Sequence, residues 1–114
     1  MRVLIVEDNR DAAESFGLLL RLAGHEVQVA HDGLQALRVF DEFAPQVAFI
    51  DLGLPGIDGF EVARRLRKNG DAGARLIALS GYGRDEDKAR AREAGFDDHL
   101  TKPVEERVVN EILA

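Results

Sequence analysis

Short apolar runs alternate with stretches of helical periodicity along the whole sequence. The clearest run is QVAFI at residues 46–50, which is almost wholly apolar and has the length of one buried strand. The expected strands are residues 2–6, 25–30, 46–50, 75–80 and 97–101, and the expected helices are residues 9–24, 33–43, 60–70, 85–95 and 104–114. This repeated alternation predicts an α/β fold in which helices cover both faces of a parallel sheet.

Polar residues and glycines mark several of the expected helix ends. Asn9, Asp32 and Asp58 precede the first three helices and carry side chains that cap helix N-termini well. Gly24 and Gly70 stand at the ends of the first and third helices, where glycine commonly stops a helix. The three helices therefore have defined limits in the sequence itself.

Composition and charge exclude several classes of protein. The chain has 114 residues, which suits one domain over residues 1–114, and it contains no cysteine for disulfides or thiolate metal sites. Its net charge of −6 argues against a nucleic-acid-binding surface. The apolar runs fall far short of the ~20 residues that span a membrane, and MRVLIVED reaches acidic residues too early for a signal peptide. We therefore expect a cytoplasmic protein that contacts neither membrane nor nucleic acid directly.

Polar residues stand at the ends of four expected strands. These ends carry Glu7–Asp8, Asp51, Ser80–Gly81 and Thr101–Lys102–Pro103. In open α/β sheets, ligands bind beyond the carboxyl ends of the strands. The four ends together are therefore the candidate functional site, whereas His25 and His31 beside the second strand are expected to be surface residues.

The carboxylates among these residues need a partner. If the first and third strands are neighbours, Asp8 and Asp51 lie at ends about 5 Å apart. Two carboxylates ~4 Å apart repel by about 4 kcal/mol at an effective dielectric constant of ~20. A bound cation or a proton on one of the two acids must therefore offset this repulsion. Oxygen ligands of this kind suit Mg²⁺. Lys102 and Ser80 would suit a phosphoryl group, and an aspartate between metal and lysine can attack phosphorus.

The four motifs together resemble the receiver domain of the two-component response-regulator family. The resemblance rests on the acidic pair Glu7–Asp8, on Asp51 within DLGLPGIDG, on Ser80–Gly81 and on Lys102–Pro103, in the family's order along residues 1–114. It implies a flavodoxin-like, doubly wound parallel sheet of five strands in the order 2-1-3-4-5, with five helices.

The resemblance also implies a reaction at Asp51. This residue would accept a phosphoryl group from a phosphohistidine on a histidine kinase or a histidine phosphotransfer domain, in a Mg²⁺-dependent step. Asp8, Asp51 and the backbone carbonyl of Gly53 would ligate Mg²⁺, and Glu7 would act mainly through a metal-bound water. The domain would catalyse its own phosphorylation and dephosphorylation without turning over an outside substrate, so it is not expected to be an enzyme.

The remaining site residues take roles in phosphoryl binding and switching by the same resemblance. Lys102 would pair with the phosphoryl oxygens and be followed by a cis peptide bond to Pro103. Ser80 and Gly81 would also bind the phosphoryl group, and Ser80 would hydrogen-bond it and move toward it. His99 occupies a position where the family usually has Tyr or Phe, so it is the candidate switch residue, with a protonation state near neutral pH.

The expected output surface is the face formed by residues 85–95, 97–101 and 104–114. It would change on phosphorylation and act on a downstream protein or an attached output or kinase domain, and it could form a homodimer. Tyr82 is expected at the edge of the phosphoryl pocket. The cognate kinase, the output, the oligomeric state, the phosphoryl lifetime and the presence of further domains stay open.

Three other functions fit the sequence less well. A receiver-like interaction module regulated without phosphorylation would usually lack an acidic residue, the aspartate or the lysine, and all are present. A phosphatase of the haloacid dehalogenase type needs a second aspartate two residues after its nucleophile, where this chain has Gly53. A nucleotide- or flavin-binding protein would show a glycine-rich phosphate loop after the first strand, which this chain lacks.

Overall fold

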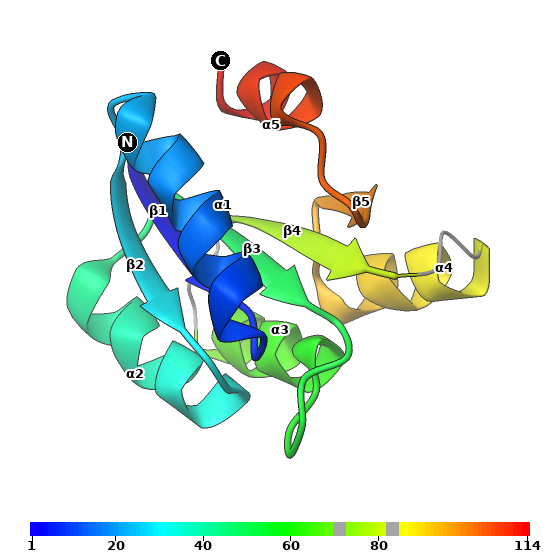
Figure 1. The fold of residues 1–114 in the computed structure, drawn as a ribbon. Coiled ribbons are helices and arrows are strands. Elements are labelled where there is room, and N and C mark those ends of the chain that lie inside the picture. The colour runs from blue at the N-terminus through cyan, green and yellow to red at the C-terminus, as the bar shows by residue number, and fades with distance from the viewer. Residues whose placement is uncertain (70–72, 82–84) are drawn as a thin grey trace.

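The computed structural model describes residues 1–69, 73–81 and 85–114, with the side chain of residue 85 left aside (Figure 1). The helix end expected at Gly70 and the pocket position expected for Tyr82 lie outside the described residues. None of the described helices has the length and hydrophobicity that a membrane span requires.

Strands and helices alternate along the chain as the sequence predicts. In chain order they are β1 (Arg2–Val6), α1 (Arg10–Leu22), β2 (Glu26–Ala30), α2 (Gly33–Phe43), β3 (Val47–Asp51), α3 (Gly59–Lys68), β4 (Arg75–Ser80), α4 (Asp85–Ala94), β5 (Asp98–Thr101) and α5 (Glu106–Leu113). All neighbouring strands are parallel, in the order β2-β1-β3-β4-β5. The expected fold class and strand order are confirmed.

The helices form a layer on each face of the sheet (Figure 1). On one face, Ile5 and Phe49 pack with residues of α1 and α5, including Leu20 and Val109. On the other face, the alternate strand residues pack against α2, α3 and α4. Both faces of the central strands are therefore buried, which explains why β1 and β3 read as continuous apolar runs.

The three expected N-caps are present. Asn9, Asp32 and Asp58 each accept a hydrogen bond from the main-chain N–H three residues later, at 3.0, 2.8 and 2.9 Å. Past the end of α1, Gly24 has a φ of 95°, a backbone conformation that favours glycine. The local signals therefore determine these helix ends as predicted.

Two expected boundaries need correction in ways that matter for the site. The third strand is β3, Val47–Asp51, one residue later than expected, so Asp51 is the last residue of the strand rather than the first after it. The last helix begins at Glu106 rather than at residue 104, because Val104 packs against the core beside α1 and α5. Residues 2–6, 33–43 and 75–80 match their expected elements at both ends, and the other ends differ by at most two residues, which is the ordinary precision of such limits.

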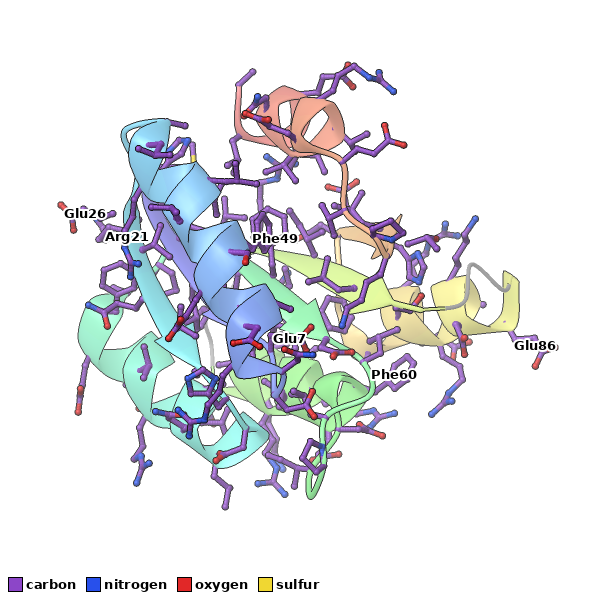
Figure 2. All side chains as sticks on the ribbon, viewed as in Figure 1. Glu7, Arg21, Glu26, Phe49, Phe60 and Glu86 are labelled. Atoms are coloured by element: carbon purple, nitrogen blue, oxygen red, sulfur yellow. The ribbon has the colours of Figure 1, made fainter. Side chains whose placement is uncertain are left out.

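Phe49 should be a major contributor to stability. Its side chain, labelled in Figure 2, is fully buried. Its ring meets the ring of Phe16 edge-on, with the two ring centroids 5.0 Å apart. Phe49→Ala should lower the free energy of unfolding by about 4 kcal/mol, measured by urea denaturation, because it leaves a cavity and removes the ring pair. Leu22→Ala, at a side chain that is 77% exposed, is the control and should change it by about 0.5 kcal/mol or less. Equal losses in the two variants would contradict the packing described here.

Candidate functional site

The carboxyl ends of β1, β3, β4 and β5 meet at one edge of the sheet. Val6 pairs with Ile50 and Ser80 pairs with Thr101, so the residues that follow each strand emerge side by side. Figure 2 shows Glu7 at this edge, near the start of α1. The parallel register thus gathers polar residues from distant parts of the chain.

Lys102 lies between two buried carboxylates. Its Nζ is 2.6 Å from Oε1 of Glu7 and 2.8 Å from Oδ2 of Asp51. The side chains of Glu7 and Asp51 are only 7% and 11% exposed, and that of Lys102 is 31% exposed. Burial of two acids is tolerated because the ammonium group pairs with both. That Glu7 contacts Lys102 directly was not expected from the sequence.

Burial and pairing shift the acid–base behaviour of this trio. Burial, followed by the hydrogen bond with Asp51, raises the pKa of Glu7 to about 7, although Lys102 opposes the shift. Burial acts to raise the pKa of Asp51 too, but hydrogen bonds with Glu7, Lys102 and the Gly53 N–H outweigh it and lower that pKa. The pKa of Lys102 is raised, since its hydrogen bonds to Asp51 and Glu7 outweigh its own burial. Of the two acids, Glu7 is therefore the one that takes up a proton first as the pH falls.

The acidic cluster at this edge fits a hard divalent cation. Glu7, Asp8 and Asp51 each offer a carboxylate oxygen, and these oxygens lie within 4.8 Å of one another. Asp8 is exposed, so the cluster opens to solvent. Oε2 of Glu7 is buried and has no hydrogen-bond partner among the described residues, a costly state that a cation or its bound water would relieve. An all-oxygen set of this kind suits Mg²⁺.

Two glycines near Asp51 have different roles. The Gly53 N–H donates to Oδ1 of Asp51 at 2.9 Å, and a Cβ there would make only an ordinary 3.6 Å contact with that oxygen. A Cβ at Gly59 would lie 2.4 Å from the main-chain carbonyl oxygen of Asp51. The start of α3 can therefore approach Asp51 only with glycine at position 59, a requirement that sequence reasoning missed. The signal was a glycine directly after the Asp58 cap.

His31 also contacts the site, which corrects its expected place as a plain surface residue. Its half-buried ring donates from Nδ1 to the carbonyl oxygen of Glu7 at 3.1 Å, because a carbonyl can only accept. The Glu7 N–H in turn donates to the carbonyl of Ala30 at 3.0 Å. The β1–β2 ladder thus places His31 beside Glu7, and only the strand pairing could have revealed this.

Ser80 lies on the opposite side of the site from the acidic cluster. Its side chain is buried, and its Oγ is 3.0 Å from Nε2 of His99. Among the residues that the structure describes, none would lie within 4 Å of a Cβ at Gly81. The Lys102 N–H donates to the Ser80 carbonyl at 2.7 Å, and the Lys102–Pro103 peptide bond is cis, as the resemblance implies.

A groove runs from this edge along α1. It has a volume of about 520 Å³, and its walls are mainly apolar, with Phe16 and Leu19 from α1 facing Pro103 and Val104. Lys102 lines the same groove. An apolar surface therefore leads directly to the charged residues.

Comparisons with known proteins agree with this arrangement. The family model for the response regulator receiver domain matches residues 3–114. The transcriptional regulatory protein PhoP of Escherichia coli K12 is 37% identical over 114 residues, covering all of this chain and 49% of PhoP. The response regulator MprA of Mycobacterium avium is 35% identical over 114 residues, and the match covers all of this chain and 48% of MprA. The chain thus spans about half the length of the curated relatives it matches.

Solved structures share the same fold. The receiver domain protein described as CheY-like from Methanospirillum hungatei has a TM-score of 0.90 at 28% identity, over 98% of this chain and 89% of that one. A second match is a co-crystal structure from Saccharomyces cerevisiae of the histidine phosphotransfer protein Ypd1 with the receiver domain of Ssk1. Its TM-score is 0.92 at 28% sequence identity, and the match covers 98% of this chain and 85% of that one. The likeness therefore extends over nearly the whole chain.

Proposed function

Because this chain belongs to the response regulator receiver domain family, we propose that residues 1–114 form a phosphoacceptor domain of a two-component phosphorelay. In this proposal Asp51 accepts the phosphoryl group of a phosphohistidine on a histidine kinase or a histidine phosphotransfer domain. The observation that carries it is the buried Asp51 carboxylate, paired with Lys102 at 2.8 Å beside an open acidic cluster.

The chemistry assigns a step to each residue. A carboxylate oxygen of Asp51 attacks phosphorus, and the bond from phosphorus to the histidine nitrogen breaks with its electron pair returning to the ring. The products are an acyl phosphate on Asp51 and a histidine without its phosphoryl group. The Gly53 N–H orients the attacking carboxylate, and Lys102 offers its charge to the phosphoryl oxygens. Ser80 donates its hydroxyl hydrogen to the group once it is transferred.

The metal in this proposal is Mg²⁺. Asp8, Asp51 and the Gly53 carbonyl would hold it, and Glu7 would act mainly through a metal-bound water. When bound, the ion supplies positive charge at the phosphoryl oxygens. Glu7 and Asp51 are paired with Lys102 in the present structure, so a cation and this lysine share the same two carboxylates.

The proposed partners use two surfaces. The groove beside α1 would receive the phosphohistidine-bearing protein, because it leads to Lys102 and the acidic cluster. The Ypd1–Ssk1 complex supports a histidine phosphotransfer protein as one such donor. The face of α4, β5 and α5 would change on phosphorylation through Ser80 and His99, and would act on a downstream protein, an attached output or kinase domain, or a second copy of the chain.

Acetyl phosphate labelling tests the proposal and its metal requirement. With Mg²⁺, the intact mass should rise by one phosphoryl group, and peptide mapping after borohydride reduction should place it on Asp51. Chelation of the metal by EDTA should slow labelling by about a hundredfold, the effect of losing a few kcal/mol of charge stabilisation.

The alternative, an interaction module regulated without phosphorylation, makes the opposite prediction. The chain would then gain no mass with acetyl phosphate or with a phosphorylated donor protein. The presence of Glu7, Asp8, Asp51 and Lys102 together favours the phosphoacceptor. Labelling that is independent of Mg²⁺, or mapped away from Asp51, would contradict it.

A further inference from the structure

A hydrogen bond joins the switch candidates Ser80 and His99. Ser80 ends β4 and His99 lies on β5, and the Oγ–Nε2 distance is 3.0 Å. Ser80 follows Leu79, the register partner of Asp51 on β4. The imidazole therefore contacts the hydroxyl that stands next to the phosphoacceptor strand.

The surroundings of the other ring nitrogen, Nδ1, indicate whether His99 or Ser80 is the donor in this hydrogen bond. Nδ1 is buried and has no hydrogen-bond partner in the described part of the chain. A hydrogen on Nδ1 would be an orphaned buried N–H, which is rare in folded proteins, whereas a lone pair there is tolerated better. The neutral ring should thus carry its hydrogen on Nε2, with the Ser80 oxygen as acceptor.

Burial and the nearby Lys88 favour the neutral form of the His99 ring. Burial lowers its pKa, Lys88 on α4 lowers it further, and Asp87 on the same helix opposes them. Arg92 of α4 and Asp97 and Asp98 beside the ring line the same pocket. The Nε2–H tautomer, rather than the imidazolium, is therefore the form relevant near neutral pH.

We propose that His99 is a positioning residue for Ser80, because its Nε2–H donates to Oγ and turns the Ser80 hydroxyl hydrogen toward the phosphoryl group on Asp51. This inference rests on the proposed phosphoacceptor function. The other neutral tautomer, with its hydrogen on Nδ1, would have the opposite effect on the Ser80 hydroxyl. Ser80 would then donate to His99, and the imidazole would compete with the phosphoryl group for the same hydrogen.

The tautomer can be read directly in the unmodified protein. Long-range ¹H–¹⁵N correlation of the ¹⁵N-histidine-labelled full chain at neutral pH should show His99 protonated at Nε2 and unprotonated at Nδ1. A hydrogen on Nδ1 would overturn the proposal. This measurement needs no variant, so a folding defect cannot obscure it.

Beryllofluoride, used with Mg²⁺ as a phosphoryl mimic, tests the consequence. His99→Phe should weaken its affinity about tenfold, the worth of one well-placed hydrogen bond, and Ser80→Ala should do the same. His99→Gln, which keeps an N–H donor, should restore part of the loss. In a Ser80→Ala background, His99→Phe should have no further effect, since His99 acts only through Ser80.

The outcomes separate the two proposals. If the wild-type protein does not bind beryllofluoride, the proposed function fails. If it binds well but His99→Phe binds equally well, or if the two substitutions add independently, the positioning role fails while the function stands.

Discussion

Asp51→Asn should abolish labelling by acetyl phosphate. The amide that replaces the carboxylate has no oxygen nucleophilic enough to attack phosphorus, yet it keeps the shape of the side chain. Its oxygen can still accept the hydrogen bond from the Gly53 N–H, which is 2.9 Å in the present structure. The variant should therefore fold and bind partners but gain no phosphoryl group in an intact-mass measurement.

A matched control makes this result specific. Asp58→Asn makes the same chemical change a few residues away, at the N-cap of α3, where asparagine caps about as well as aspartate. It should label at the wild-type rate. Equal labelling of Asp51→Asn and the wild type would remove Asp51 from the phosphoacceptor role.

Lys102→Met should lower the free energy of unfolding of the metal-free protein by about 3 kcal/mol near pH ~8. Methionine preserves the length of the side chain but leaves Glu7 and Asp51 as buried acids without their cation. Breaking a buried pair costs about 3 to 5 kcal/mol, and the lower end applies because Lys102 is partly exposed.

The loss should depend on pH with a definite sign. Glu7 has a pKa raised to about 7, so it takes up a proton as pH falls and no longer needs the lysine. Asp51 has a lowered pKa and stays ionised, so it still requires a partner. The difference between variant and wild type should thus shrink between about pH 8 and about pH 5.5, and urea denaturation at both values measures it.

Mg²⁺ should stabilise Lys102→Met more than it stabilises the wild type, because the ion meets no competing ammonium group at Glu7 and Asp51. Lys68→Met, on the exposed end of α3, is the control and should shift stability by about 0.5 kcal/mol or less under every condition. A pH-independent loss, or an equal response to Mg²⁺, would contradict the charge network.

Local signals in the sequence explain why the fold was predictable. The caps Asn9, Asp32 and Asp58 act through bonds that span three residues, so the sequence alone contains both partners. The apolar runs that define the strands are likewise continuous in the sequence, so they can be recognised without knowing the tertiary contacts. The start of α5 was placed too early because Val104 is drawn into the core, a contact that depends on α1 and is not local.

The candidate site was predictable at the level of its residues rather than of its contacts. Strand ends place Asp51 and Lys102 at one edge of the sheet, which the sequence predicts. The direct contact of Lys102 with Glu7 and the hydrogen bond from His31 to the Glu7 carbonyl depend on side-chain direction and strand register. No pattern in a single sequence determines those quantities.

The close approach of Gly59 to Asp51 has a consequence for engineering. The Gly59 N–H donates to the Leu52 carbonyl at 3.2 Å, so the two ends of the intervening loop are joined to each other. The loop tip at Pro55 and Gly56 is exposed. Lengthening a loop with fixed ends costs little, about 0.6 kcal/mol per doubling. A reporter peptide inserted between Pro55 and Gly56 would therefore sit close to Asp51 without displacing it.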